Sequence, residues 1–194
     1  MQVKSAVATS GSSLAITYPA AQTAGNLNVV AVMWGDTTAS VSSVTDSKNN
    51  VYALAVGPTQ TTGVTQSIYY AKNIVAGSNT VTVTFSQAAS WPNVNVLEYS
   101  GLSTTSPLDV FATASGSGTA ANSGAATTTS ANELIFGTGS TTNAATAAGS
   151  GFSNRIINSF GDISEDKIVS STGSYNATAT MTSGSWVMQM VAFR

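Results

Sequence analysis

Carboxylates carry most of the acid–base chemistry that this sequence still permits. The 194 residues include no His and no Cys, so Ser-His-Asp and Cys-His systems and the usual neutral-pH proton shuttle are absent. A zinc site would consist of carboxylates alone, which is rare. Glycoside cleavage needs only paired carboxylates, and Glu98 is the best-placed candidate, because it shares a strand face with Val94 and Val96.

Glu98 has no obvious catalytic partner. No other expected strand offers a similarly placed Asp or Glu, and a carboxylate inside an apolar strand has a raised pKa unless it is paired. We expect a structural role, in which Glu98 accepts hydrogen bonds from loop backbone or pairs with Lys4 or Lys72. The alternatives are catalysis, and an isopeptide crosslink with Glu98 as proton shuttle, as in some Gram-positive surface domains. The chain is therefore not expected to be an enzyme.

A second group of carboxylates lies in the segment from Gly161 to Lys167, which contains Asp162, Glu165 and Asp166. Calcium takes six to eight oxygen ligands, and carboxylates with backbone carbonyls in such loops supply them. The spacing does not match an EF-hand loop. Two interpretations stay open: a structural calcium ion bound by the three carboxylates, or a solvated turn with Lys167 as counter-ion. No other cofactor is expected.

Trp91 is the leading candidate for ligand contact. It follows an expected strand and precedes a proline, which predicts a loop position. Exposed aromatic rings stack on the apolar faces of sugars, while amide side chains bind their hydroxyls. Asn93 and Gln87 are close enough in sequence to supply such contacts. The alternative is that Trp91 packs over the end of the fold.

Two further aromatic residues are adjacent in one expected strand. Tyr69 and Tyr70 must point to opposite faces, so we expect one ring in the core and the other free for a ligand. Trp34 and Trp186 lie within apolar strands and are expected in the core.

The elements that position these residues are short strands. Runs rich in Val, Ile, Thr and Tyr alternate with Gly, Asn, Asp and Ser, as in sandwiches and barrels, and no long stretch has a helical apolar period. Leu27–Trp34 is almost continuously apolar, which predicts a central strand covered on both faces, whereas Thr80–Phe85 alternates and predicts a half-buried strand. The sequence therefore predicts an all-β fold, an antiparallel two-sheet β-sandwich.

An internal repeat suggests how this sandwich is built. Ala76–Phe85, followed by Trp91 and Asn93–Tyr99, matches Thr172–Met181, followed by Trp186 and Val187–Phe193. We expect one domain, residues 1–194, of jelly-roll type and pseudo-duplicated, with halves at about 1–114 and 115–194. Chance similarity between simple β segments is the alternative. The Ser- and Gly-rich segment Ser115–Ser130 is interpreted as a loop that leads into a strand rather than as a domain boundary.

Charge limits the partners. Only 7% of residues are charged, against roughly 25% in average proteins, and six basic residues with a net charge of −2 cannot neutralise a phosphate backbone. We expect no nucleic acid as partner. No apolar run has the roughly 20 residues that span a bilayer, so no membrane insertion is expected.

Four motifs resemble a known kind of module. They are Val44–Tyr52, Tyr69–Ile74, Leu97–Leu102 and Trp186–Phe193, and together they resemble a recurrent β-sandwich module, jelly-roll or immunoglobulin-like, of bacterial secreted and cell-surface proteins. The resemblance covers most of the chain. It implies an extracellular or cell-surface location and an accessory or architectural role, and it provides no active-site or binding residues to transfer.

Two functions follow as expectations. The first is a non-catalytic extracellular accessory module that binds polysaccharide through exposed aromatic residues. The alternative is a structural or adhesive surface subunit that pairs edge strands with neighbouring copies to form stalks or fibres. For that alternative the terminal strands Val3–Thr9 and Trp186–Phe193 are the expected donor and acceptor.

Overall fold

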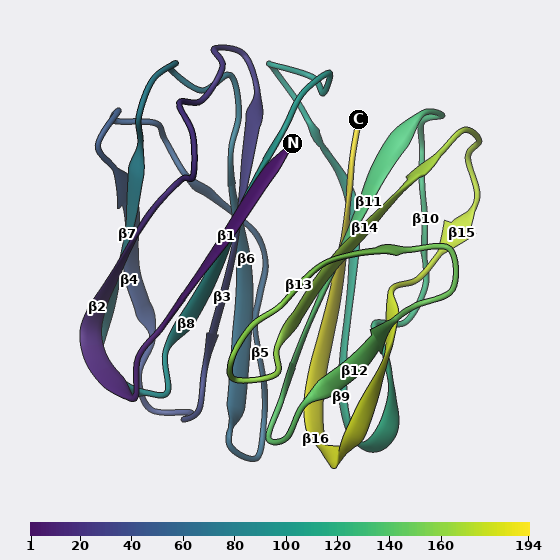
Figure 1. Cartoon of the computed structure of the whole chain (residues 1–194). Coiled ribbons are helices and arrows are strands. Elements are labelled where there is room, and N and C mark those ends of the chain that lie inside the picture. Colours follow the sequence, from purple (N-terminus) through teal and green to yellow (C-terminus); the bar gives the residue numbers. More distant parts are fainter.

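The computed structural model describes residues 1–194 and contains sixteen strands and no helix (Figure 1). All strand pairs are antiparallel, which confirms the predicted all-β fold. No helix is present that could traverse a bilayer. The strands are β1 Gln2–Val7, β2 Ser10–Thr17, β3 Leu27–Trp34, β4 Val41–Asp46, β5 Ala53–Thr61, β6 Val64–Ala71, β7 Thr80–Ser90, β8 Asn93–Tyr99, β9 Leu108–Asn122, β10 Ala126–Thr127, β11 Glu133–Thr141, β12 Ala145–Ala148, β13 Ser153–Ile157, β14 Ile163–Val169, β15 Ser174–Tyr175 and β16 Thr178–Phe193.

The strands form four sheets rather than the two expected. A three-stranded sheet, β2-β7-β4, covers one face of a five-stranded sheet, β1-β8-β3-β6-β5. The other face of the five-stranded sheet packs on β12-β16-β11-β14-β13, to which β9 adds through β16. A small β10-β15 pair completes the fold. The layers therefore follow one another from left to right in Figure 1.

Strand β3 shows why the middle layer forms. All eight residues of Leu27–Trp34 are buried, as the continuous apolar run predicts. Val30 and its alternate neighbours face the core shared with the three-stranded sheet. Val29 and its neighbours face the core shared with Phe136 of the second half of the chain. Burial on both faces removes the need for polar residues, so the pattern identifies the central strand from sequence alone.

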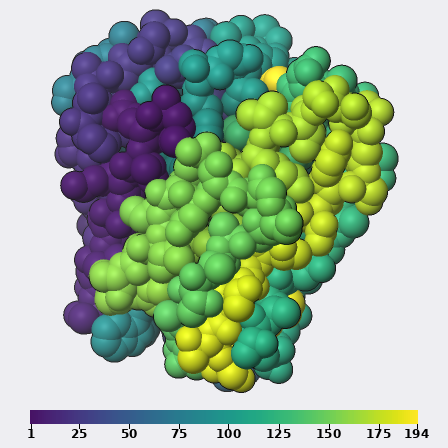
Figure 2. Space-filling view, turned by 45° about the vertical axis from the view of Figure 1, so that its right-hand side comes forward, coloured from purple at the N-terminus to yellow at the C-terminus, as the bar shows by residue number.

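The two halves of the chain have the same strand order except for β12, which pairs with β16 whereas its counterpart β4 pairs with β7. The series β1-β8-β3-β6-β5 becomes β9-β16-β11-β14-β13 when eight is added to each number, and the pairs β2-β7 and β10-β15 correspond in the same way. In the space-filling view the two halves lie directly against each other (Figure 2). The equal order is what a duplicated jelly roll would give; the jelly-roll type and the duplication stay predictions.

Strand β9 replaces the loop expected after residue 114. Ser115–Asn122 continues the strand that begins at Leu108 and pairs with β16, so the expected order of loop and then strand is wrong for this segment. One of the two glycines of β9 is required by packing. A Cβ at Gly116 would lie 2.6 Å from the ring of Trp186, so only glycine lets this large ring lie against the strand.

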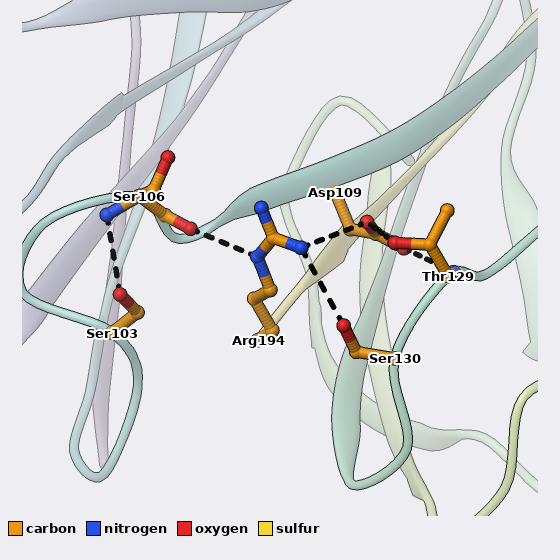
Figure 3. A network of polar contacts seen from close by, with 6 residues as sticks. All are labelled: Ser103, Ser106, Asp109, Thr129, Ser130 and Arg194. Carbon is orange, nitrogen blue, oxygen red and sulfur yellow. Dashed lines mark hydrogen bonds and ion pairs between the residues drawn. The ribbon is translucent and has the colours of Figure 1, made fainter.

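A polar network joins the end of β16 to the segment that connects the halves (Figure 3). Arg194 donates from Nε to the backbone oxygen of Ser106 at 3.1 Å, and its Nη1 lies 3.5 Å from Asp109 Oδ1 and 3.5 Å from Ser130 Oγ. Asp109 also accepts a hydrogen bond from the backbone nitrogen of Thr129 at 2.7 Å. The guanidinium thus bridges three segments that are distant in sequence.

Candidate functional site

A pocket of about 360 Å³ opens where the two halves meet. The first half contributes the end of β3, the β5–β6 hairpin and the β7–β8 connection, and the second half contributes the end of β11 and the turn before β14. The lining residues are Trp34, Gly35, Gly63, Val64, Trp91, Asn93, Ser140, Thr141, Thr142, Phe160 and Asp162. The pocket therefore exists only when both halves are packed together.

Trp91 forms the rim of this pocket. The side chain is 54% exposed, and its ring meets that of Phe160 edge to face, with centroids 5.5 Å apart and an interplanar angle of 80°. Two rings at nearly a right angle form an apolar corner. Trp91 thus packs partly over the end of the fold, and the exposed remainder of its ring leaves ligand contact a prediction.

The backbone at Trp91 is strained. Its φ of +49° lies in the left-handed region, which costs a bulky residue roughly 1–3 kcal/mol. Neighbouring hydrogen bonds enforce it: Trp91 N donates to Thr9 O at 2.9 Å, Ala8 N donates to Pro92 O at 3.0 Å, and Ser90 N donates to Asp36 Oδ2 at 2.7 Å. These hydrogen bonds therefore hold the Trp91 backbone in this conformation, and the contact with Phe160 packs one side of its ring.

Asn158 organises the polar wall opposite. Its Oδ1 accepts hydrogen bonds from the backbone nitrogens of Phe160 at 2.9 Å and Asp162 at 3.1 Å, which is an Asx-type turn. Its Nδ2 donates to Asn93 Oδ1 at 3.0 Å, which connects the turn to β8. Sequence reasoning missed Asn158 and Phe160. The Asn-Ser-Phe-Gly-Asp pattern could have indicated the turn, but not its contact with β8.

Asp162 is the single carboxylate in the pocket lining. Burial raises its pKa to about 6, although hydrogen bonds from Thr141, Ser140 and Asn93 oppose this shift. The bond from Thr141 N to Asp162 Oδ1 is 2.9 Å long. Asp162 is thus a buried carboxyl group whose hydrogen bonds from neutral donors offset only part of the effect of burial.

The other predicted ligand contacts lie elsewhere. Gln87 is exposed on β7 and donates to Thr38 Oγ1 at 3.0 Å, outside the pocket. Tyr69 and Tyr70 are both half-buried, each against a different core, so neither is the freely available ring that was expected. Tyr70 packs against Phe193 with centroids 5.6 Å apart and an interplanar angle of 60°, and it borders a second pocket. Of the predicted set, only Trp91 and Asn93 meet at the pocket.

The three proposed calcium ligands do not converge. β14 begins at Ile163, so the segment is a buried strand rather than a solvated turn. Glu165 Oε2 accepts from Gly149 N at 2.8 Å, whereas Asp166 forms an ion pair with Arg155 at 2.7 Å, and Asp162 faces the pocket. Alternation along the strand separates the carboxylates, and no group of three or more His, Cys, Asp or Glu side chains is placed to hold a metal.

Glu98 has the expected structural environment. It is buried, and Oε1 accepts from Thr23 N at 2.9 Å and from Asn26 Nδ2 at 2.8 Å. Oε2 accepts from Gln2 Nε2. These bonds tie three segments near one end of the five-stranded sheet, in agreement with the expected hydrogen bonding to loop backbone.

The pocket combines an aromatic corner, amide and hydroxyl groups, and one shielded carboxylate. Such a lining suits a polar ring compound with an apolar face, because the rings cover that face while the polar groups pair with its hydroxyls. No protein-family model, no curated protein and no solved structure matches this chain.

Proposed function

We propose that the chain is a non-catalytic, extracellular carbohydrate-binding module that holds a sugar unit of a polysaccharide in the pocket between its halves. The observation that carries this proposal is Trp91, a half-exposed ring held in a strained backbone conformation. Strain of this kind persists where the surrounding structure enforces it and clusters at ligand sites. A preorganised ring loses little entropy on binding.

The size and charge of the pocket favour a neutral sugar. A volume of about 360 Å³ is near the lower end for small-molecule sites, which suits one or two rings of a longer chain. Asn93 of the first half and Asp162 and Thr142 of the second half lie in the wall. With one carboxylate, the pocket lacks the pair needed for glycoside hydrolysis, which supports binding rather than cleavage.

The proposal is tested by measuring binding to a panel of soluble neutral polysaccharides, by calorimetry and affinity electrophoresis. We expect one of them to bind, and Trp91→Ala to weaken that binding more than about tenfold, since an anchoring aromatic contributes about 2 kcal/mol. Phe111→Ala is the matched control: Phe111 is 52% exposed, close to the 54% of Trp91, and does not line the pocket. The control should bind as wild type does.

Two results would contradict the proposal. One is the absence of binding to every polysaccharide in the panel. The other is equal affinity of Trp91→Ala and wild type while denaturant unfolding shows that both variants remain folded.

The alternative function, a surface subunit that assembles through edge strands, requires different strands from those expected. β16 lies between β9 and β11 and offers no edge along Trp186–Phe193. β1 is an edge, and it carries Lys4. The edge that favours self-association is β9, which pairs with β16 on one side only.

A further inference from the structure

Strand β9 is a long sheet edge whose middle lacks the usual protection. It pairs with β16 on one side only. From Phe111 to Gly118 its register with β16 has no shift, and after Asp109 the strand contains no charged residue and no proline. Edges of natural sheets are normally protected by charge, proline, bulges or short length, because unpaired backbone groups attract other strands.

Every other edge in the molecule has such protection. β1 carries Lys4 at an exposed position, and β5 contains Pro58 and two register shifts. β13 carries Arg155 beside a register shift, and β2, β4 and β12 are each interrupted by one. β10 and β15 have two residues each. β9 has two register shifts as well, but they lie toward its ends and leave Phe111–Gly118 uninterrupted, a longer unshifted run than any other edge has.

The hydrogen bonds that β16 makes to its two neighbours show which backbone N–H and C=O groups of β9 are free. Ser185 exchanges hydrogen bonds with Thr142 after β11, at 3.0 and 3.1 Å, so its backbone faces β11. The direction of the backbone N–H and C=O groups alternates from one residue of a strand to the next. The backbone groups of Trp186 and Met188 therefore point toward β9. Their partners Gly116 and Ala114 are thus bonded inward. The residues between them, Ser115 and its alternate neighbours, present their N–H and C=O groups to solvent.

We propose that β9 pairs antiparallel with β9 of a second copy, about a two-fold axis at Ser115. Ser115 is the residue with outward backbone groups nearest the middle of the regular run Phe111–Gly118. On this axis Ser115 faces Ser115 of the other copy, and Thr113 faces Ser117. A two-fold contact needs a self-complementary surface, and a neutral edge of small residues is one. The net charge of −2 adds little repulsion.

This dimer joins the six-stranded sheets of two copies into one continuous sheet. It does not depend on the proposed carbohydrate site, because no β9 residue lines the pocket. β5 lies beside β9 through a bond of 2.7 Å between Thr59 Oγ1 and Thr113 Oγ1. Pro58 keeps that neighbouring edge from pairing in the same way.

The test is sedimentation of the purified chain over a wide concentration range. We expect a reversible change from the 19.5 kDa monomer to twice that mass. Ser115→Lys places like charges directly opposite each other, which destabilises a strand pair, and should weaken the dimer at least about tenfold. Ser171→Lys is the control with the same charge change, at an exposed loop position; it should dimerise as wild type does.

A charge exchange makes the test specific. Ser115→Glu alone should also be monomeric, whereas an equal mixture of Ser115→Lys and Ser115→Glu should form heterodimers, because opposite charges then face each other. Recovery in the mixture excludes misfolding as the cause of the single-variant losses. A wild type that stays monomeric at all concentrations overturns the proposal, and so does a mixture that remains monomeric.

Discussion

Replacing Asp46 by Ala is expected to lower the free energy of unfolding by roughly 3–5 kcal/mol, since it breaks a buried hydrogen-bond network. The Asp46 carboxylate ends β4 and accepts five hydrogen bonds. Oδ1 accepts from the backbone nitrogens of Lys48 and Asn50, each at 3.0 Å. Oδ2 accepts from Asn50 Nδ2 at 2.8 Å, Tyr52 Oη at 2.9 Å and Asn79 Nδ2 at 2.8 Å.

The loss is large because the donors cannot easily find other partners. Asn79 is 1% exposed, and burial raises the pKa of Asp46, yet bonds from Asn79 and Asn50 outweigh that effect and lower it. The ionised carboxylate therefore stabilises the fold. The total free energy of unfolding of a folded domain is roughly 5–15 kcal/mol, so the variant would lose a considerable part of its stability.

Asp46→Asn is the matched variant. It keeps the shape and one acceptor oxygen, so we expect roughly half the loss of Asp46→Ala. Guanidinium unfolding at pH 7, followed by tryptophan fluorescence, measures both. If the free energy of unfolding of Asp46→Ala lies within about 1 kcal/mol of the wild-type value, the network does not stabilise the β4–β5 connection.

The same residue shows what the sequence could predict. Asp46–Asn50 is recognisable as a turn from its Asp and Asn content, and a turn is present after β4. The turn does not close a hairpin, because β4 and β5 belong to different sheets. The bond to Asn79 joins residues that are 33 positions apart. Turn preference is local, whereas the partner of a buried carboxylate is set by tertiary packing.

Strand prediction succeeded where burial leaves a mark on composition. β3 has the predicted bounds because both faces require apolar residues. The part of β9 after Ala114 was not predicted as a strand. A segment rich in Ser, Gly and Ala looks like a linker when the sequence does not show which residues pack against it. Gly116 is needed because the ring of Trp186 packs against it. These two residues are separated by about a third of the chain length, so the local sequence does not reveal the contact.

The predicted ligand residues lie in different places for a geometric reason. β6 starts at Val64 in the pocket and ends near Tyr69 and Tyr70, some distance along the strand. The alternation of residues along a strand shows which face of the sheet a residue occupies. It does not show how far the residue lies from either end of the sandwich. Trp91 was found because an aromatic residue before proline marks an exposed corner. Phe160 was not, because its role depends on the packing of the halves.

Three buried carboxyl groups make the stability of this protein sensitive to pH. Burial raises the pKa of Glu165 to about 7, against bonds from Gly149 and Thr178 and the positive charge of Lys167. Burial, together with the negative charge of Asp109 nearby, raises the pKa of Glu133 to about 7, with Arg194 opposing. The pKa of Asp162 is raised to about 6 by burial. In the folded state these groups hold protons that the unfolded chain releases.

The free energy of unfolding is therefore expected to fall as pH rises from 5 to 8. The unfolded pKa is 4.5 for the two Glu side chains and 3.8 for Asp162. A carboxyl whose folded pKa lies above this value stabilises the fold fully below the unfolded pKa, and this stabilisation is lost as pH rises through the folded pKa. Each of the three groups contributes roughly 1–2 kcal/mol, which urea unfolding at constant ionic strength resolves. Glu165→Gln cannot titrate, so its profile should be flatter by one group. A wild-type profile that is level or rising between pH 5 and 8 would show that these carboxyls are not held protonated.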